Sequence, residues 1–351
     1  MKKRIALLLT AVLAVGTLAT ACGGNNGGSA DAGAAVKVGL GSCVSFSESY
    51  SIGEDHYGQP ATATNAQVDI HVASVMLDAE GKIVQCDVDA IQVKGSVDAT
   101  GTLAADTATT FTSKNDLKEG YNMKGASPIG KEWYEQVSAY EQWAVGKTVD
   151  EIKAGVGADA YPADETLKTG CTIVVSDIAA AVVDACETAT ESTATSNDTL
   201  GLAIIGEMTN VAAATAEEDG KFQAYVNFAT TTRDAEGKIT SVIIDSIQAY
   251  PTWGVDGVLT TDANQDVRTK YEKQFDYGMK GVSASNGVIA EGGEWFEQID
   301  VFKQLIVGKT AADVEAIAVD DAGYPTDETL RTGCTMKVSA YKTAVVKSLA
   351  E

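Results

Sequence analysis

The 351-residue chain is poor in basic residues and in histidine. Its 26 lysines and arginines stand against 49 aspartates and glutamates, which gives a formal charge of −23 at pH 7. Because phosphate binding relies on a basic surface, this charge argues against nucleic acid as a partner. The two histidines, His56 and His71, both lie in the first half of the chain. They leave little room for a His-rich metal site, a haem ligand set or a His-dependent triad.

Cysteine motifs for metals are also missing. The six cysteines form no CxxC or CxxCH pattern, so the sequence offers no iron–sulfur, zinc or c-type haem site. Buried free thiols are the favoured state for the five cysteines that follow the N-terminal segment. A disulfide between Cys43 and Cys86, or between Cys171 and Cys186, stays open as the alternative in an exported protein. The fifth of these cysteines is Cys334.

The N-terminus has the pattern of an export signal. Residues 1–4 are basic, and residues 5–18 form an apolar run that is too short for a membrane span. Small residues then precede Cys22, and a stretch rich in Gly, Asn and Ser follows it. This arrangement resembles the lipobox of bacterial lipoproteins. The resemblance implies a signal peptide over 1–21, a lipid on Cys22 and a flexible tether over 22–35. A plain secretory signal with a chance cysteine is the alternative.

The remainder of the chain is a tandem duplication. Residues 78–83 recur as 234–239, and the stretch 121–127 recurs as 277–283, both at an offset of 156. After a six-residue insertion in the second copy, residues 132–136 match 294–298. The last match pairs residues 161–172 with 324–335. We therefore expect two domains, called repeat 1 (36–189) and repeat 2 (200–351), joined by a Thr-, Ser- and Ala-rich linker over 190–199. Each is expected to bury its own core and to fold independently.

Hydrophobic periodicity predicts an α+β fold for each repeat. Val68, Ile70 and Val72 alternate with polar residues, as in a half-buried strand, and the Gly-containing turn 78–82 predicts an antiparallel hairpin into a strand over 83–93. The counterpart strand is expected over 238–249. Apolar residues at helical spacing then predict helices that begin near Trp133 and Trp295. Closing helices are expected over 176–189 and 339–349, each with a serine N-cap. The prediction is a small antiparallel sheet covered by helices in each repeat.

One short motif near the end of each repeat suggests a cofactor. Thr169-Gly170-Cys171-Thr172 recurs as Thr332-Gly333-Cys334-Thr335, each before a closing helix. Together with the Asp-x-Glu-Gly-Lys hairpin, this order resembles the FMN-binding domain family found in the sodium-pumping NADH:quinone oxidoreductase and in surface lipoproteins of extracellular electron transfer. That family holds FMN through a phosphoester to the last Thr of a Ser/Thr-Gly-Ala-Thr motif, attached by a flavin transferase. The resemblance implies FMN on Thr172 and Thr335, with Thr169, Gly170, Thr332 and Gly333 shaping the turns.

The motif departs from the family pattern in three respects, the first being that the Ser after the motif comes one residue late, at Ser176 and Ser339. Cys171 and Cys334 replace the family's Ala, and the family's Asp falls at Thr166 and Thr329, so the nearest acids are residues such as Asp164 and Asp327. The alternative is that each motif is a tight turn kept for packing. If FMN is bound, Trp133 with Tyr134, or Trp295 with Phe296, is expected to cover its ring. Solvated side chains are favoured for Lys124 and Lys280, and a contact with the phosphate or the flavin is the alternative.

These patterns favour an electron carrier over an enzyme that turns over a substrate. The expected protein is a lipoprotein on the extracytoplasmic face of the cell membrane, with two FMN-binding domains that relay electrons from a membrane electron donor. A cofactor-free binding or adhesion lipoprotein on the same scaffold is the alternative. Carboxylate pairs at Glu132 and Glu135, and at Glu294 and Glu297, are expected on an exposed helix face rather than in acid–base catalysis.

Overall fold

A computed structural model of the chain describes residues 33–285 and 287–350. The expected signal peptide, Cys22 and the tether up to residue 32 lie outside these residues. Within them, no helix has the length and apolar character needed to cross a membrane. The fold is α+β with antiparallel sheets, as predicted.

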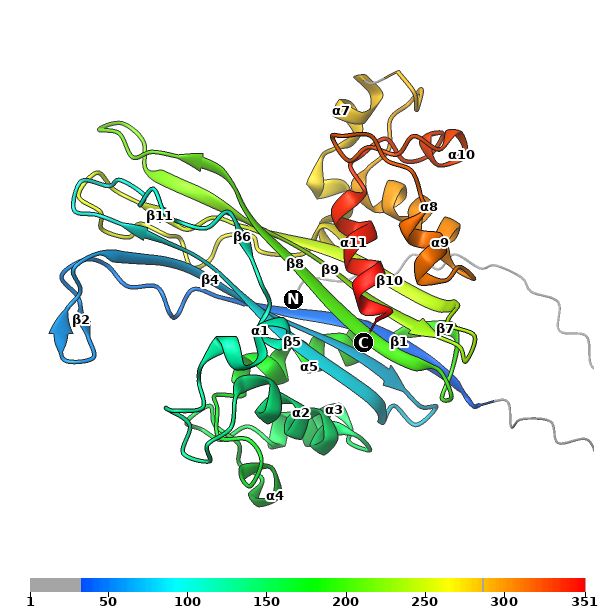
Figure 1. The fold of residues 1–351 in the computed structure, drawn as a ribbon, viewed down its shortest axis with the longest axis horizontal. Helices are drawn as coiled ribbons and strands as arrows, with labels where there is room; N and C mark the ends of the chain where they lie inside the picture. The colour runs from blue at the N-terminus through cyan, green and yellow to red at the C-terminus, as the bar shows by residue number, and fades with distance from the viewer. Residues whose placement is uncertain (1–32, 286, 351) are drawn as a thin grey trace, which may run out of the picture. The chain divides into compact units, whose positions relative to one another are not determined.

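Two antiparallel sheets form the framework (Figure 1). The first sheet has the strand order β5-β4-β1-β7, built from β1 (Ala35–Ser45), β4 (Thr64–Leu77), β5 (Ile83–Val97) and β7 (Thr190–Thr195). The second has the order β10-β9-β8-β6, built from β6 (Thr110–Phe111), β8 (Thr199–Ala212), β9 (Gly220–Arg233) and β10 (Ile239–Ala249). Short β11 (Thr252–Trp253) pairs with β9, and β2 (Asp55–His56) pairs with β3 (Gln59–Pro60).

The predicted hairpins are present in both repeats. Asp78 Oδ1 accepts hydrogen bonds from the backbone N–H groups of Glu80 and Lys82, and Asp234 makes the same bonds in repeat 2. Gly81 adopts a φ of 77° that an L side chain strains to reach. The turn chemistry therefore fixes the register in which β4 meets β5 and β9 meets β10.

Helices cover the outer face of each sheet, those of the two repeats on opposite sides (Figure 1). Repeat 1 contributes α1 (Lys114–Leu117), the 3₁₀ turn η1 (Lys118–Tyr121), α2 (Trp133–Ala144), α3 (Val149–Ala154), α4 (Glu165–Lys168) and α5 (Ser176–Thr188). Repeat 2 contributes α6 (Lys270–Lys273), η2 (Gln274–Tyr277), α7 (Lys280–Ser285), α8 (Trp295–Ile306), α9 (Ala311–Glu315), α10 (Glu328–Arg331) and α11 (Ser339–Ser348). The predicted helices beginning at Trp133 and Trp295 are confirmed, and both tryptophans are buried.

The closing helices lie close to the first strand of their repeats because glycine stands at the contact. A Cβ on Gly39 would lie 1.9 Å from the carbonyl oxygen of Ala185 in α5. A Cβ on Gly201 would lie 2.0 Å from that of Ser348 in α11. The predicted serine N-caps are one residue off, because the cap positions are Val175 and Val338 and neither makes a side-chain cap bond.

The hydrophobic core is shared between the repeats. Each repeat has its own cluster between sheet and helices, but a third cluster joins residues of β4 and β5 to residues of β8, β9 and β10. Consequently β4 is buried on both faces, and the half-buried strand predicted at Val68, Ile70 and Val72 is wrong. One face meets the helices and the other meets the second sheet.

The two sheets are related by an approximate two-fold symmetry. Strand β5 lies against β8, and the equivalent strands β10 and β1 lie against each other. Ser74 and Thr230, which correspond at the 156-residue offset, hydrogen bond to each other through their hydroxyls. Such a contact between equivalent residues is what a two-fold axis produces.

The segment expected as a linker is part of the sheet. Residues 190–195 form β7, which pairs with β1 at the edge of the first sheet. Thr193 also donates a hydrogen bond to the Thr240 carbonyl in repeat 2. Composition alone suggested a flexible connection here, but threonine is also a good strand former when it meets an edge that needs a partner.

Candidate functional site

Both candidate attachment threonines are held by a buried glutamine. The backbone N–H of Thr172 donates to Gln136 Oε1 at 2.8 Å, and its hydroxyl donates to the same oxygen at 3.1 Å. Thr335 makes the same two bonds to Gln298 Oε1, at 2.7 and 3.2 Å. Each threonine is half-buried, and neither glutamine is exposed to solvent by more than 1%.

The glutamines tie three repeated motifs together. Gln136 Nε2 donates to Ser127 Oγ at 3.1 Å, and Gln298 Nε2 donates to Ser283 Oγ at 3.0 Å. The stretch containing this serine, the helix containing the glutamine and the threonine turn are thus joined in each repeat. This network gives the repeated residues a structural role whether or not a cofactor is attached.

The other residues of the two Thr-Gly-Cys-Thr motifs pack or hydrogen bond within the turn. Cys171 and Cys334 are fully buried, and burial raises the pKa of their thiols to about 11 and about 12. A Cβ on Gly170 would lie 2.7 Å from the Ala139 side chain, and Gly333 meets Val301 in the same way. The hydroxyls of Thr169 and Thr332 donate to carbonyls three residues earlier and are exposed.

The acids near the motif are helix caps rather than the displaced family aspartate. Asp164 Oδ1 accepts from the backbone N–H of Thr166 and Leu167 at the start of α4, and Asp327 accepts from Leu330 N–H at the start of α10. These bonds hold the pKa of Asp164 below its usual value.

Two of the four glutamates predicted on an exposed helix face, Glu132 and Glu294, are buried, contrary to the prediction, whereas Glu135 is half-buried and Glu297 is exposed. Glu132 and Glu294 are each 4% exposed. Glu132 accepts from the backbone N–H of Met123 and Lys124, and Glu294 accepts from Met279 and Lys280. Each also forms a capping box with the glutamate three residues on. Glu132 and Glu294 therefore fasten a loop to the start of a helix.

The structure does not bring the expected aromatic cover to the threonines. Trp295 is buried, and its Nε1–H donates to Tyr341 Oη at 3.0 Å. Tyr134 donates to Glu119, and Phe296 packs edge-on against Phe275. The side chains of Lys124 and Lys280 are exposed. The backbone N–H groups of these two residues donate to the buried Glu132 and Glu294.

A pocket does lie beside Thr335. It has a volume of about 360 Å³ and is lined by Val288, Asp320, Tyr324, Pro325, Thr326, Arg331 and Thr335. Among the described residues Arg331 makes no ion pair, so its guanidinium is available to an anion. Its counterpart in repeat 1 is Lys168, whose ammonium pairs with Glu165 at 2.7 Å. The two threonine turns therefore differ in the charge that stands beside them.

A second pocket, in repeat 1, was not foreseen from the sequence. It lies between the sheet and the helices, has a volume of about 280 Å³, and is lined by Ser47, Glu48, Asp69, His71, Gln92, Lys114, Tyr121, Met123, Trp133, Ile173, Val174 and Asp177. We call it the Lys114 pocket. The sequence signal that could have found it is the recurrence of Lys114 as Lys270 at the 156-residue offset.

The equivalent place in repeat 2 is filled by side chains. Lys270 Nζ donates to Tyr225 Oη at 2.8 Å, and Tyr225 Oη shares a hydrogen bond of 2.9 Å with Tyr341 Oη. Tyr225 stands where repeat 1 has Asp69, and Tyr341 where it has Ile178. Burial lowers the pKa of Lys270 to about 7. Here the lysine has its acceptor within the protein.

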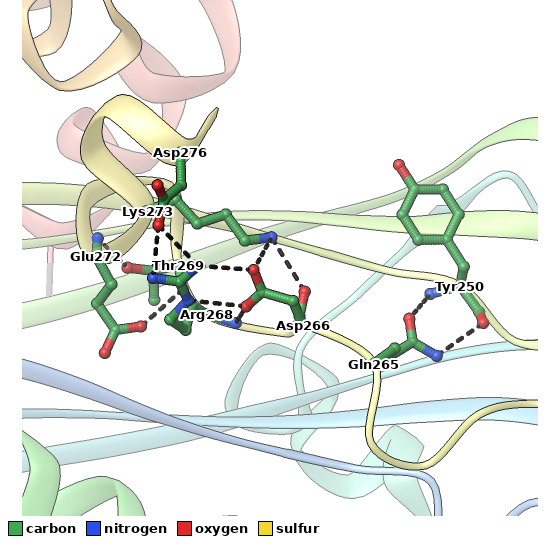
Figure 2. Close-up of polar contacts among 8 residues, drawn as sticks. All are labelled: Tyr250, Gln265, Asp266, Arg268, Thr269, Glu272, Lys273 and Asp276. Carbon is green, nitrogen blue, oxygen red and sulfur yellow. Dashed lines mark hydrogen bonds and ion pairs between the residues drawn. The ribbon is translucent and has the colours of Figure 1, made fainter. Parts of the chain in front are cut away.

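The loop that leads to Lys270 is also braced (Figure 2). Arg268 forms ion pairs with Asp266 at 2.9 Å and Asp276 at 3.2 Å, as Figure 2 shows. The Gln265 side chain exchanges hydrogen bonds with the backbone of Tyr250. Thr269 then caps α6 with Glu272 in a capping box, one residue before Lys270. Repeat 1 has Thr110 and Thr112 in place of Asp266 and Arg268.

Residues 33–285 and 287–350 contain no group of three or more His, Cys, Asp or Glu side chains placed to hold a metal ion. The five cysteines within them are free, as favoured from the sequence, with Cys43 and Cys86 half-buried. Comparison of the chain with protein-family models, with curated proteins and with solved structures found no match.

Proposed function

We propose that this chain is an exported, lipid-anchored protein of the extracytoplasmic membrane face that carries FMN on Thr335, and on Thr172 at lower occupancy, and relays electrons. The observation that supports Thr335 is the pocket of about 360 Å³ that places its side chain beside Arg331. A guanidinium next to a threonine hydroxyl suits a phosphoester, because it balances the phosphate charge.

The attachment chemistry needs an activated flavin donor and a transferase. A flavin dinucleotide supplies both the phosphate and the leaving group: the bond from Thr335 Oγ1 to phosphorus forms, the pyrophosphate bond breaks, a nucleoside monophosphate leaves, and the hydroxyl proton is released to solvent. FMN would supply the redox chemistry. On the protein side, Arg331 would balance the phosphate, Tyr324 would offer an aromatic wall, and Gln298 would hold the turn. To react, the hydroxyl has to give up its 3.2 Å bond to Gln298 Oε1.

Intact-protein mass spectrometry after co-expression with a flavin transferase from the same source tests this proposal. We expect a main added mass of FMN less one water and a minor species that carries two such additions. Thr335→Ala should remove the main addition, and the matched Thr172→Ala should remove only the minor one. Arg331→Ala should lower the occupancy, whereas Lys168→Ala should not. A wild type without any flavin after co-expression would overturn the proposal. Cys171→Ala and Cys334→Ala together then show whether the cysteines alone block modification.

The lipid anchor has its own test. Cys22 lies in the lipobox-like stretch, so Cys22→Ser should release the protein from the membrane fraction into the medium. Continued retention of the Cys22→Ser protein in membranes would contradict lipidation at this residue.

A cofactor-free binding lipoprotein is the second candidate, and one observation favours it. The buried glutamine network accounts for Thr172 and Thr335 in both repeats without a modification. In that case the colourless wild-type protein would melt at the same temperature with and without the transferase.

A further inference from the structure

The Lys114 pocket is lined by a mostly buried lysine whose ammonium has no acceptor within the described protein. Lys114 is 7% exposed, yet among residues 33–285 and 287–350 its ammonium has neither a hydrogen-bond acceptor nor a carboxylate within 4 Å. Its Nζ lies 5.0 Å from the ring centre of Tyr121 and 5.2 Å from that of Trp133. Aromatic faces stabilise an ammonium partly, but they do not replace its hydrogen bonds.

A second polar atom in the same pocket is also unpartnered. His71 is 9% exposed, and its Nδ1 is buried without a hydrogen bond in the described part of the chain. Asp177 Oδ2 lies 4.0 Å from this nitrogen, too far for a hydrogen bond. Burial, together with Lys114, lowers the pKa of His71 to about 3, so the ring is neutral and the contact is not an ion pair.

The charges around the pocket have both signs. Lys114 is the one cation among the residues that line it, while Asp69, Asp177 and Glu48 bring carboxylates. Asp69 is already bonded on both oxygens by the amides of Gln67 and Gln92. Asp177 keeps one oxygen, Oδ2, without a hydrogen bond in the described structure, and it is the one that faces His71 Nδ1.

We propose that the Lys114 pocket binds a small zwitterion of the α-amino acid type with an apolar side chain. The ligand carboxylate would accept from Lys114 Nζ, and its ammonium would donate to Asp177 Oδ2 and His71 Nδ1. Tyr121, Trp133 and Ile173 would cover its apolar part. The carboxylates would repel an anion that has no ammonium, and Lys114 would repel a cation that has no carboxylate. A ligand that carries both charges therefore suits both ends of the pocket. The volume of about 280 Å³ fits a single small molecule.

Repeat 2 provides the matched comparison. There the hydroxyls of Tyr225 and Tyr341 occupy the equivalent space, and Lys270 donates to Tyr225. The same lysine is thus satisfied by the protein in one repeat and left for a ligand in the other. This proposal does not depend on flavin, because the Lys114 pocket and the pocket of Thr335 share no lining residue.

Isothermal titration calorimetry on the full chain, kept in detergent, tests the proposal. The probes are the twenty α-amino acids, followed for the best binder by the amine that lacks its carboxylate and the acid that lacks its ammonium. We expect saturable binding of an apolar or aromatic amino acid, at least tenfold weaker for each half-charged analogue. If no amino acid binds at millimolar concentration, or if one analogue binds as well as the zwitterion, the proposal is wrong.

Variants locate the binding. Lys114→Met should weaken binding at least tenfold, and Lys270→Met, the matched change in repeat 2, should leave it unchanged. Equal effects of the two changes would overturn the assignment to repeat 1. Should Lys114→Met fail to fold by circular dichroism, Asp177→Asn decides the matter, because its side chain is one-third exposed and tolerates the change. Unaltered affinity in Asp177→Asn would then contradict the proposed ammonium contact.

Discussion

Repeat 1 and repeat 2 share a fold but differ in what fills the space between sheet and helices. In repeat 1 this space is a pocket with an unpartnered lysine, and in repeat 2 two tyrosines close it. The parts that are identical in both, such as the glutamine network, hold the chain in shape. The parts that differ are where a ligand would bind. Comparison within one chain therefore separates structural residues from candidate binding residues without any relative.

The contacts at which the closing helix of one repeat meets the other repeat also differ in charge. We call these contacts the seams: Lys347 and Asp116 form one, and Asp184 and Glu272 form the other. Lys347 forms an ion pair with Asp116 where α11 meets repeat 1. At the equivalent seam the corresponding residues are Asp184 and Glu272, two acids that line a pocket of about 210 Å³. Burial, with Glu272 adding to it, raises the pKa of Asp184. Opposite charges close the seam at Lys347, whereas two acids of like charge line the pocket at the seam of Asp184.

Separating the repeats is expected to have the largest effect. The apolar cluster between the sheets draws on both repeats, so each half alone would expose its share to water. We therefore expect fragments 36–189 and 200–351 to lose cooperative melting as monomers, in place of the independent folding predicted from the sequence. Calorimetry with sedimentation measures this. Two cooperative, monomeric melts would contradict the importance of the shared core.

The glutamine network should matter equally in both repeats. Gln136→Leu leaves the backbone N–H of Thr172 without its acceptor, and Gln298→Leu does the same to the backbone N–H of Thr335. Each change should lower the free energy of unfolding by about 2 kcal/mol. Urea denaturation checks it. A loss in only one repeat would contradict the equivalence of the two turns.

His71 should make stability depend on pH in repeat 1. Its pKa of about 3 in the folded protein lies below the unfolded value of 6.5, so the unfolded state binds more protons between these values. Stability should therefore fall as the pH drops from about 6.5 toward 3. His71→Asn, which copies Asn227 of repeat 2, should flatten this part of the profile of melting temperature against pH. An unchanged slope in the variant would assign the dependence to other groups.

The seams should give the smallest effects, of opposite sign. Glu272→Gln removes the repulsion on Asp184 while keeping an oxygen that can accept from Thr269 N–H, and should stabilise by a few tenths of a kcal/mol. Asp116→Asn weakens the pair with Lys347 and should destabilise by about 0.5 kcal/mol. Both are measurable as shifts in the urea midpoint. The same sign for both changes would contradict the electrostatic difference between the seams.

Local sequence patterns predicted the hairpins and helices, but they did not predict how the two sheets pack together. The turn at Asp78 and the apolar spacing from Trp133 and Trp295 gave the hairpins and helices. The burial of both faces of β4 could not be read from its alternation, because the second covering layer comes from the other repeat. The shared pocket of Lys114 and His71 could not be predicted for the same reason, because no single stretch of sequence indicates that β4, α1 and α5 converge on it.

The contact between Ser74 and Thr230 across the approximate two-fold axis has a consequence for how such a molecule can change. In a dimer of identical chains, every substitution appears in both protomers at once, so a side chain that fills one site also fills the other. A chain that carries both halves in one gene product escapes this coupling. A tyrosine can enter the interior of one half and strengthen it as a scaffold, while the other half keeps an aspartate and an open cavity.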